Sequence, residues 1–156
     1  QPPRNLQRKS HCRVGRMAST CSLITLGCRF YRSALVSLTM PLKPLATETV
    51  VKKSSHDCFY RTSMDADLEA LGLRPCRDTI VVTGIGSNNC VYHAVIGFHV
   101  RNYFVVVPED CIHATRPEGQ VFALSQFRAS LYSFNVTVTR SENIRVTVPA
   151  ENYIRA

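Results

Sequence analysis

Hydrophobic positions recur in two alternating patterns from residue 49 onward. Short runs rich in β-branched and aromatic residues predict strands at residues 49 to 53, 78 to 85, 103 to 107 and 134 to 139. Helical patterns fill the intervals, at residues 62 to 72, 90 to 101 and 117 to 131. This order of strands and helices predicts an α/β domain, and right-handed crossovers make its sheet largely parallel.

The first of these helices carries its own start and stop signals. Residues 62 to 65 (TSMD) fit a capping box, in which side chains bond the first free backbone N–H groups. Met64, Leu68 and Leu71 share one face, which is expected to be buried. Gly72 is typical of the left-handed residue that ends a helix.

Residues 1 to 47 lack a sustained period and contain four of the eight prolines. We expect a basic arm or targeting region there, extended and with at most one short strand at residues 22 to 26. Residues 48 to 156 would then form one α/β domain, which suits a chain of 156 residues.

Charge divides the chain at the same place. Of the 19 basic and 11 acidic residues, the first 47 positions hold eight basic residues and no acidic one, so the net charge of +8 lies in the arm. Such a segment is typical of mitochondrial targeting, or of an arm that contacts RNA or an anionic lipid surface. A translated leader with a start at Met17 is the alternative. No apolar run is long enough for a transmembrane helix. We expect a mitochondrial protein, and otherwise a cytoplasmic one.

The seven cysteines predict neither a disulfide framework nor a zinc site, because their number is odd and no C-x-x-C pair occurs. Most are expected to be small buried residues in a reducing compartment. His93, His99 and His113 are expected to be surface or packed residues, not metal ligands. We therefore expect neither a metal nor a cofactor.

Two residues stand where a parallel sheet usually binds its ligands, beyond the carboxyl ends of the strands. Lys53 closes the first predicted strand, and the turn GIGSNNCV places Cys90 at the start of a helix. There, free backbone N–H groups and the positive end of the helix dipole favour the thiolate. The ammonium of Lys53 would act in the same direction and make Cys90 a nucleophile. Taken alone, a cysteine at such a turn is more often structural than catalytic.

The surrounding residues carry a family resemblance. Lys53, Phe59 and Thr62 are spaced as K-x5-F-x2-T, and residues 83 to 91 contain T-G-I-x-x-N-x-C-V, followed by an apolar strand that ends in Asp110. Residues 48 to 130 thereby resemble the second half of the isochorismatase-like cysteine hydrolases, which include nicotinamidases and amidohydrolases. The resemblance implies a three-layer, Rossmann-like fold with a mostly parallel sheet that lacks its usual first half.

The resemblance also implies a role for each matching residue. Cys90 would attack a carbonyl or amide carbon, and Lys53 would orient and stabilise its thiolate. The backbone N–H groups of Gly86 and Cys90 would form an oxyanion hole, aided by a cis peptide bond between Ile85 and Gly86. Two further residues would line the substrate pocket: Phe59 and Asn88.

The chain departs from the family's pattern at the general base. The family has an Asp at the end of its first strand that accepts the cysteine's proton, whereas no acidic residue precedes Glu48 here. Asp57 and Asp110 are the nearest substitutes, but each follows a different strand and neither matches the position. Smaller departures lie in and after the helix that follows the cysteine: Ala94, Phe98 and Asn102.

These departures favour a non-catalytic, isochorismatase-like subunit of a larger assembly, in which Cys90 and Lys53 are the remainder of a site. A mitochondrial respiratory complex, the ATP synthase and the mitochondrial ribosome would each suit a basic arm. Either partner subunits or the arm's own residues 22 to 26 would cover the incomplete sheet. The alternative is an active cysteine amidohydrolase whose base comes from another residue or chain. A third possibility is a fragment of a longer gene product.

Overall fold

The computed structural model describes residues 10–18, 21–27, 48–129 and 134–145, with side chains from residue 48 onward. Its strands are β1 (Ser10–Ala18), β2 (Cys21–Gly27), β3 (Thr49–Lys53), β4 (Thr79–Ile85), β5 (Phe104–Pro108), β6 (Ile112–His113) and β7 (Val136–Thr139). Its helices are α1 (Met64–Ala70), α2 (Cys90–His99) and α3 (Pro117–Phe127), with short 3-10 helices η2 (Glu109–Cys111) and η3 (Ser141–Asn143). No helix in these ranges is long and apolar enough to cross a membrane.

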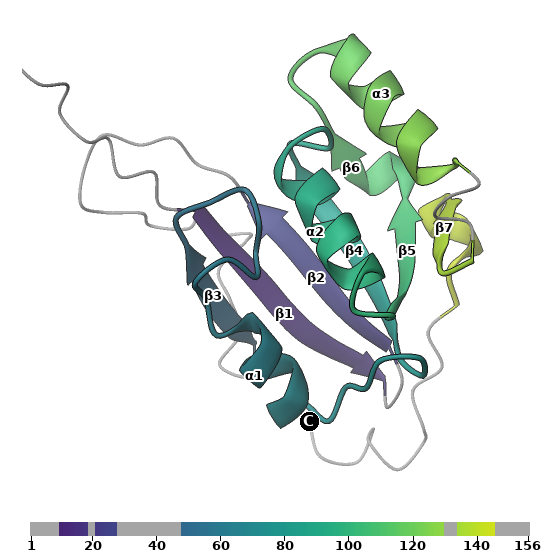
Figure 1. Ribbon diagram of the computed structural model, residues 1–156. Coiled ribbons are helices and arrows are strands. Elements are labelled where there is room, and N and C mark those ends of the chain that lie inside the picture. The colour runs from purple at the N-terminus through teal and green to yellow at the C-terminus, as the bar shows by residue number, and fades with distance from the viewer. Residues whose placement is uncertain (1–9, 19–20, 28–47, 130–133, 146–156) are drawn as a thin grey trace, which may run out of the picture.

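The strands form one sheet in the order β3-β1-β2-β4-β5-β7, and β6 pairs with β4 beside this path (Figure 1). The pairs β2–β4, β4–β5, β4–β6 and β5–β7 are parallel, which confirms the mostly parallel sheet. Strand β1 is antiparallel to both β2 and β3. Strand β3 therefore runs in the same direction as β4, and the two strands end at the same edge of the sheet.

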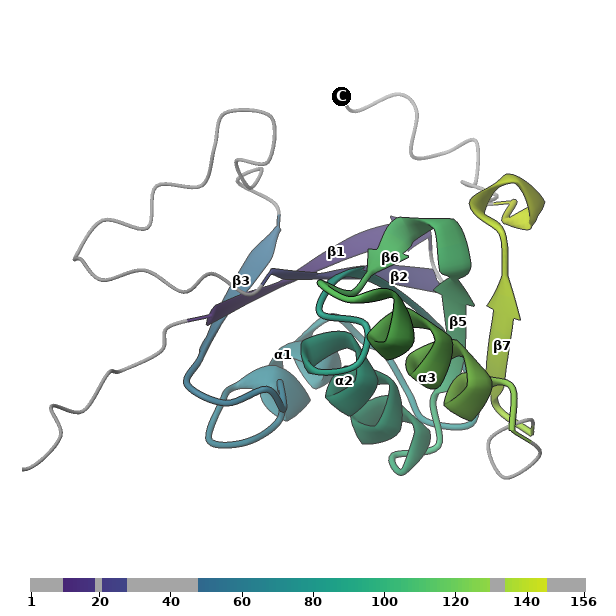
Figure 2. The same ribbon diagram turned by 90° about the horizontal axis from the view of Figure 1, so that it is seen from above.

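The three α-helices cover one face of the sheet (Figure 2). Each lies between two strands in the chain, and the steps from β3 to β4, from β4 to β5 and from β5 to β7 all move in one direction along the sheet. Right-handed crossovers that move in one direction place their helices on the same face. The described residues thus form two layers of the α/β fold, the sheet and one helical layer.

The core lies between the sheet and the helices. Alternate residues of β3 and β5 face it, so that Val51, Val105 and Val107 are buried while Val50 and Phe104 are exposed. The described helices contribute eight fully buried residues to this core: Met64, Leu68, Val91, Ala94, Val95, Phe98, Ala123 and Phe127. Ala94 and Phe98, which depart from the family's pattern, are therefore core residues.

Two local expectations are wrong. Strand β1 was not predicted, whereas β2 contains the short strand expected at residues 22 to 26. The capping box is not formed, because Ser63 is the N-cap of α1 and its side chain makes no cap hydrogen bond. The Ser63 hydroxyl instead donates to the carboxylate of Asp67, at 2.7 Å. The division into an arm at residues 1 to 47 and a domain from residue 48 stays a prediction.

Candidate active site

Cys90 is the first residue of α2 and follows the turn that leaves the carboxyl end of β4 (Figure 1). This confirms the predicted position at a helix N-terminus. Gly86 begins the turn with a φ of 82°, which favours glycine over residues with a Cβ. The Cys90 side chain is fully buried, so an ionised thiolate there would need a cation or hydrogen-bond donor beside it.

The turn is fastened to two neighbouring elements. The backbone N–H groups of Gly86 and Ser87 both donate to the carbonyl oxygen of His113 in β6, each at 3.0 Å. The buried Ser87 hydroxyl donates to the Oε1 of Gln120 in α3, at 2.7 Å. Strand β6 and helix α3 therefore hold the turn that presents Cys90.

The peptide bond between Ile85 and Gly86 is trans, so the expected cis bond is wrong. The chain makes this turn through the positive φ of Gly86, which removes the need for a cis bond. The oxyanion-hole role of the Gly86 and Cys90 N–H groups stays a prediction. It requires the hydrogen bond from Gly86 to His113 to open when a substrate binds.

Lys53 ends β3 at the same edge of the sheet and is only 4% exposed. Its Nζ donates to the backbone oxygens of Ser55 and His56, at 2.9 and 3.0 Å. A buried ammonium requires such partners, and here both belong to the loop that follows its own strand. Lys53 therefore fixes the loop at residues 54 to 56. Its direct action on the thiolate stays a prediction.

His56, which the sequence analysis did not single out, lies beside the nucleophile. Its Nδ1 is 3.3 Å from the Sγ of Cys90, within hydrogen-bonding distance for sulfur. The His56 ring also stacks on His93 of α2, with ring centroids 5.8 Å apart and an interplanar angle of 25°. The described structure thus joins the end of β3 to the start of α2 through a histidine and a cysteine.

The two residues assigned to the substrate pocket pack against helices. Phe59 is 8% exposed, and its ring contacts Phe98 edge to face, with centroids 4.9 Å apart. The Arg101 guanidinium lies 3.6 Å from the centroid of the Phe59 ring. Asn88 lies against Gly119 at the start of α3, where an added Cβ would be 2.8 Å from the Asn88 Nδ2. The pocket roles of Phe59 and Asn88 stay predictions.

Gly97→Ala should destabilise the protein by about 1–2 kcal/mol. Alanine favours a helix over glycine by about 1 kcal/mol, but overpacking a core usually costs about 1–3 kcal/mol. Here the new Cβ would lie 2.6 and 2.7 Å from Cδ2 and Cε2 of Phe59, closer than side chains can approach. The Phe59 ring cannot move away easily, because Phe98 and Arg101 pack against it. Urea unfolding would measure the loss.

Phe59→Leu provides the control for this clash. In the variant with both Gly97→Ala and Phe59→Leu, the loss of stability should be smaller than the sum of the two single losses, because the shorter side chain removes the close contact. Additive losses would show that the glycine is not required by the phenylalanine ring.

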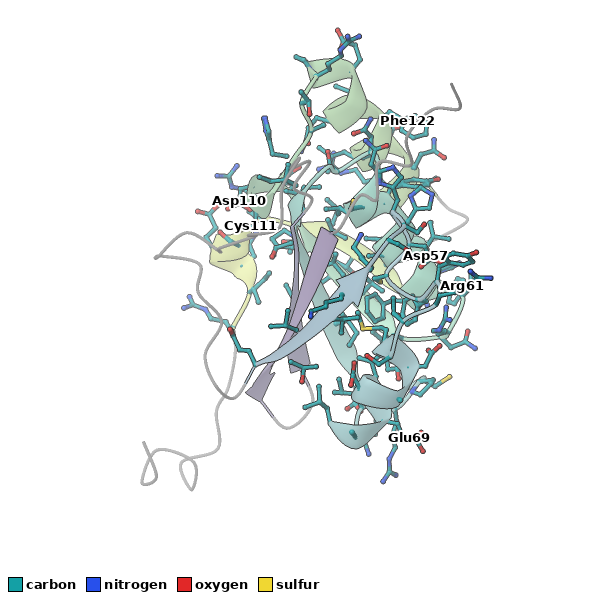
Figure 3. All side chains as sticks on the ribbon, turned by 90° about the vertical axis from the view of Figure 1, so that its left-hand side faces the viewer. Asp57, Arg61, Glu69, Asp110, Cys111 and Phe122 are labelled. Carbon is teal, nitrogen blue, oxygen red and sulfur yellow. The ribbon has the colours of Figure 1, made fainter. Side chains whose placement is uncertain are left out.

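The carboxylates of Asp57 and Asp110, the two aspartates considered as a substitute base, bond to groups other than Cys90. The Asp57 Oδ1 accepts a hydrogen bond from the Phe59 N–H, at 2.8 Å. Asp110 accepts from the backbone N–H and the hydroxyl of Ser141, and these two bonds lower the pKa of its exposed carboxyl. Figure 3 shows Asp57 and Asp110 on opposite sides of the ribbon.

The environments of His99 and His113 differ from that of His56. His99 Nδ1 is 2.5 Å from the Oδ1 of Asn135, and the His113 side chain is exposed. Among the residues with described side chains, no three His, Cys, Asp or Glu residues gather as a metal site would require.

Comparison with known proteins decides the family. The sequence pattern of the Isochorismatase domain matches residues 33–142, well over half of the chain. This chain belongs to the isochorismatase family. The match includes β3, the His56 loop, the cysteine turn and all three α-helices.

The chain is similar to several named proteins of the isochorismatase family. The uncharacterised isochorismatase family protein YaaI of Bacillus subtilis is 29% identical over 103 residues, covering 66% of this chain and 53% of YaaI. The ureidoacrylate amidohydrolase RutB of Methylobacterium radiotolerans is 37% identical over 84 residues, covering 53% of this chain and 31% of RutB. The crystal structure of N-carbamoylsarcosine amidase from Thermoplasma acidophilum superposes with a TM-score of 0.52 and 30% identity, covering 67% of this chain and 54% of that one.

The chain therefore spans about half the length of YaaI and less than a third of that of RutB. The part that matches the family pattern, residues 33–142, includes the cysteine turn and the strand that ends in Lys53. The fold of this part is that of the isochorismatase family.

Proposed function

We propose that the chain carries the nucleophile of an isochorismatase-family amidohydrolase that cleaves a C–N bond in a small amide or ureido compound. The observation that carries this proposal is the contact between Cys90 Sγ and His56 Nδ1, at 3.3 Å, at the start of a helix. A thiol at a helix N-terminus with an imidazole in reach is the arrangement that nucleophilic thiol catalysis requires.

The substrate class is proposed from the relatives. RutB and N-carbamoylsarcosine amidase are both named for substrates in which a carbonyl carbon lies between two nitrogen atoms. In such a reaction the thiolate attacks the carbonyl carbon, the C–N bond breaks and the nitrogen leaves with a proton. Water then hydrolyses the bond between sulfur and carbon and restores the thiol.

A second candidate is a non-catalytic subunit of a larger, mitochondrial assembly, with residues 1 to 47 against RNA, anionic lipid or partner subunits. One observation favours it: residues 1 to 47 contain eight basic and no acidic side chains, a charge that suits contact with RNA or anionic lipid. The two candidates differ in whether Cys90 forms a covalent intermediate.

The experiment is an ammonia-release assay of the full chain with N-carbamoyl amino acids, primary amides such as nicotinamide, and ureidoacrylate. We expect release from at least one ureido compound, and an acid-quenched sample should show a mass increase that maps to the Cys90 peptide. A folded protein that releases no ammonia and forms no adduct with any of them would favour the non-catalytic subunit.

A further inference from the structure

We propose that His56 is the catalytic base of this site and takes the Cys90 proton that an aspartate takes elsewhere in the family. This inference rests on the proposed hydrolase function. It concerns a residue to which the family resemblance gives no role, and it follows from the contact between the two side chains.

The distance suits both protonation states of the pair. With neutral His56, the thiol donates its hydrogen to Nδ1 across 3.3 Å, and the imidazole hydrogen is then on Nε2. After proton transfer the same Nδ1 carries a hydrogen and donates to the thiolate. The proton therefore moves without a change in the positions of sulfur and nitrogen, as efficient general-base catalysis requires.

The backbone of His56 is held by the buried ammonium of Lys53. The Lys53 Nζ donates to the carbonyl oxygens of Ser55 and His56, so one cation fixes two consecutive peptide units next to the imidazole. Lys53 is 4% exposed, and solvent cannot readily replace these bonds. In this arrangement Lys53 is a positioning residue for the base.

His93 provides a second contact to the imidazole ring. The His93 Nδ1 lies 2.7 Å from the backbone oxygen of Asn89, and since a carbonyl only accepts, this nitrogen carries a hydrogen. The fixed His93 ring stacks on His56 at 5.8 Å between centroids. The two residues that hold His56 lie at the end of β3 and in the first turn of α2, the turn that also contains Cys90.

The position of Cys90 at the N-terminus of α2 favours a thiolate. The His56 imidazole contacts the Cys90 thiol and the His93 ring, and the His56 backbone oxygen accepts a hydrogen bond from the Lys53 ammonium. A thiolate at Cys90 would be next to the imidazolium and at the positive end of α2. Proton transfer from sulfur to nitrogen forms the thiolate and the imidazolium together, so each ion is next to its opposite charge.

The reaction then balances with His56 as the single proton carrier. The Cys90 proton moves to Nδ1, and the thiolate attacks the carbonyl carbon. The leaving nitrogen takes the proton from the imidazolium as the C–N bond breaks. A water molecule gives its proton to the neutral imidazole and attacks the acyl carbon, and the sulfur leaves as the thiolate, which regains the proton from His56.

The test compares wild type with His56→Gln and with His56→Asn, whose side-chain amide can replace the hydrogen bond of Nδ1 but cannot carry the proton. The first readout is the rate of Cys90 alkylation by iodoacetamide between pH 5 and 9, mapped by mass spectrometry. Three other cysteines serve as internal standards, since Cys76 and Cys111 are exposed and Cys58 is as buried as Cys90. His99→Gln, at the last residue of α2 and outside the cysteine turn, is the matched control, because a glutamine amide can still donate to Asn135, and thermal unfolding verifies that every variant folds.

We expect wild-type Cys90 to react at pH 6 to 7 at least tenfold faster than Cys58, and both His56 variants to lose this neutral-pH reactivity. In the ammonia assay both variants should lose about a hundredfold in kcat, within the usual contribution of a general base. His99→Gln should resemble wild type in both assays.

Two results would overturn the inference. If Cys90 shows the same alkylation profile in wild type and in the His56 variants, the histidine does not control the thiol, whether or not the protein hydrolyses amides. If the His56 variants hydrolyse at the wild-type rate while Cys90→Ala is inactive, the proposed function stands and His56 is not its base. The alkylation readout decides the role of His56 even if no substrate is found.

Discussion

Cys90→Ala is expected to lower amide or ureido hydrolysis by at least about a thousandfold, because removing the nucleophile of a covalent mechanism leaves only the residual effect of binding and oxyanion stabilisation. Position 90 is the first residue of α2, where a small residue such as alanine is well tolerated, so the helix should persist. The loss should therefore appear in kcat with little change in thermal stability. Ammonia release at saturating substrate would measure it.

Cys58→Ala is the matched control for this prediction. Both sulfurs are fully buried, and both substitutions remove one atom, but Cys58 lies in the hydrophobic core cluster under the helices. Its replacement should lower stability modestly and leave kcat within about threefold of wild type, a margin much smaller than the thousandfold loss expected at Cys90. Equal activities in the two variants would refute the nucleophile assignment.

Asp78→Asn should destabilise the fold by about 2–3 kcal/mol at pH 7, the largest single loss expected for a polar residue here. The Asp78 side chain is fully buried at the start of β4, and its carboxylate accepts hydrogen bonds from the Arg77 side chain and from the Arg74 N–H at 2.7 Å. Asparagine retains one acceptor but loses the charge that strengthens both bonds. Urea unfolding at constant pH would give the difference.

The pH dependence of this contribution follows from the direction of the Asp78 pKa. Burial alone would raise the pKa, but the hydrogen bonds from Arg77 and Arg74 and their positive charges outweigh it and lower the pKa. A carboxyl group with a lowered pKa in the folded state stabilises the fold above its unfolded value of about 3.9. The contribution is lost as the pH falls through the folded-state value. The difference between wild type and Asp78→Asn should therefore be constant near neutrality and shrink below about pH 4.

Asp65→Asn is the control for charge alone. Asp65 pairs with Arg101 at 2.7 Å, but its side chain is 64% exposed. Exposed ion pairs usually contribute about 0–1 kcal/mol, so this variant should lie within that range of wild type. If the two asparagine variants were equally stable, burial of the Asp78 pair would have no special effect.

The elements with strong local patterns could be predicted from the sequence. Strand β3 has the predicted bounds, and α2 begins at the predicted residue and ends two residues earlier than expected. Asn102, after this helix, adopts a φ of 61°, a left-handed conformation that asparagine tolerates better than most residues. Such elements are specified by hydrophobic periods and end signals within a short stretch of chain.

Strand β1 could not be predicted in this way. Its sequence, SHCRVGRMA, has neither regular alternation nor a high content of β-branched residues. The strand exists because it bonds to β2 on one side and to β3 on the other, and β3 lies more than 30 residues further along the chain. Hydrogen bonds between distant segments leave no periodic trace in either segment.

Only part of the candidate site could be predicted, for the same reason. Cys90 and Lys53 could be located because each ends or begins a recognisable element. His56 lies in a loop without a period, and its contact with Cys90 joins residues 34 positions apart. One indication was present in the sequence, since His56 follows Lys53 by three residues at the edge of the sheet where Cys90 was expected.

Strand β1 lies between β3 and the rest of the sheet, so the two halves of the site are expected to form at different stages of folding. Cys90 belongs to the contiguous unit of β4, α2 and β5, whose contacts are local and can form early. Lys53 and His56 follow an edge strand whose pairing with β1 must close a long stretch of chain. The edge should open at a lower free energy than the central unit. Mild denaturant should therefore separate the thiol from its imidazole, and abolish activity, before the core that holds Cys90 unfolds.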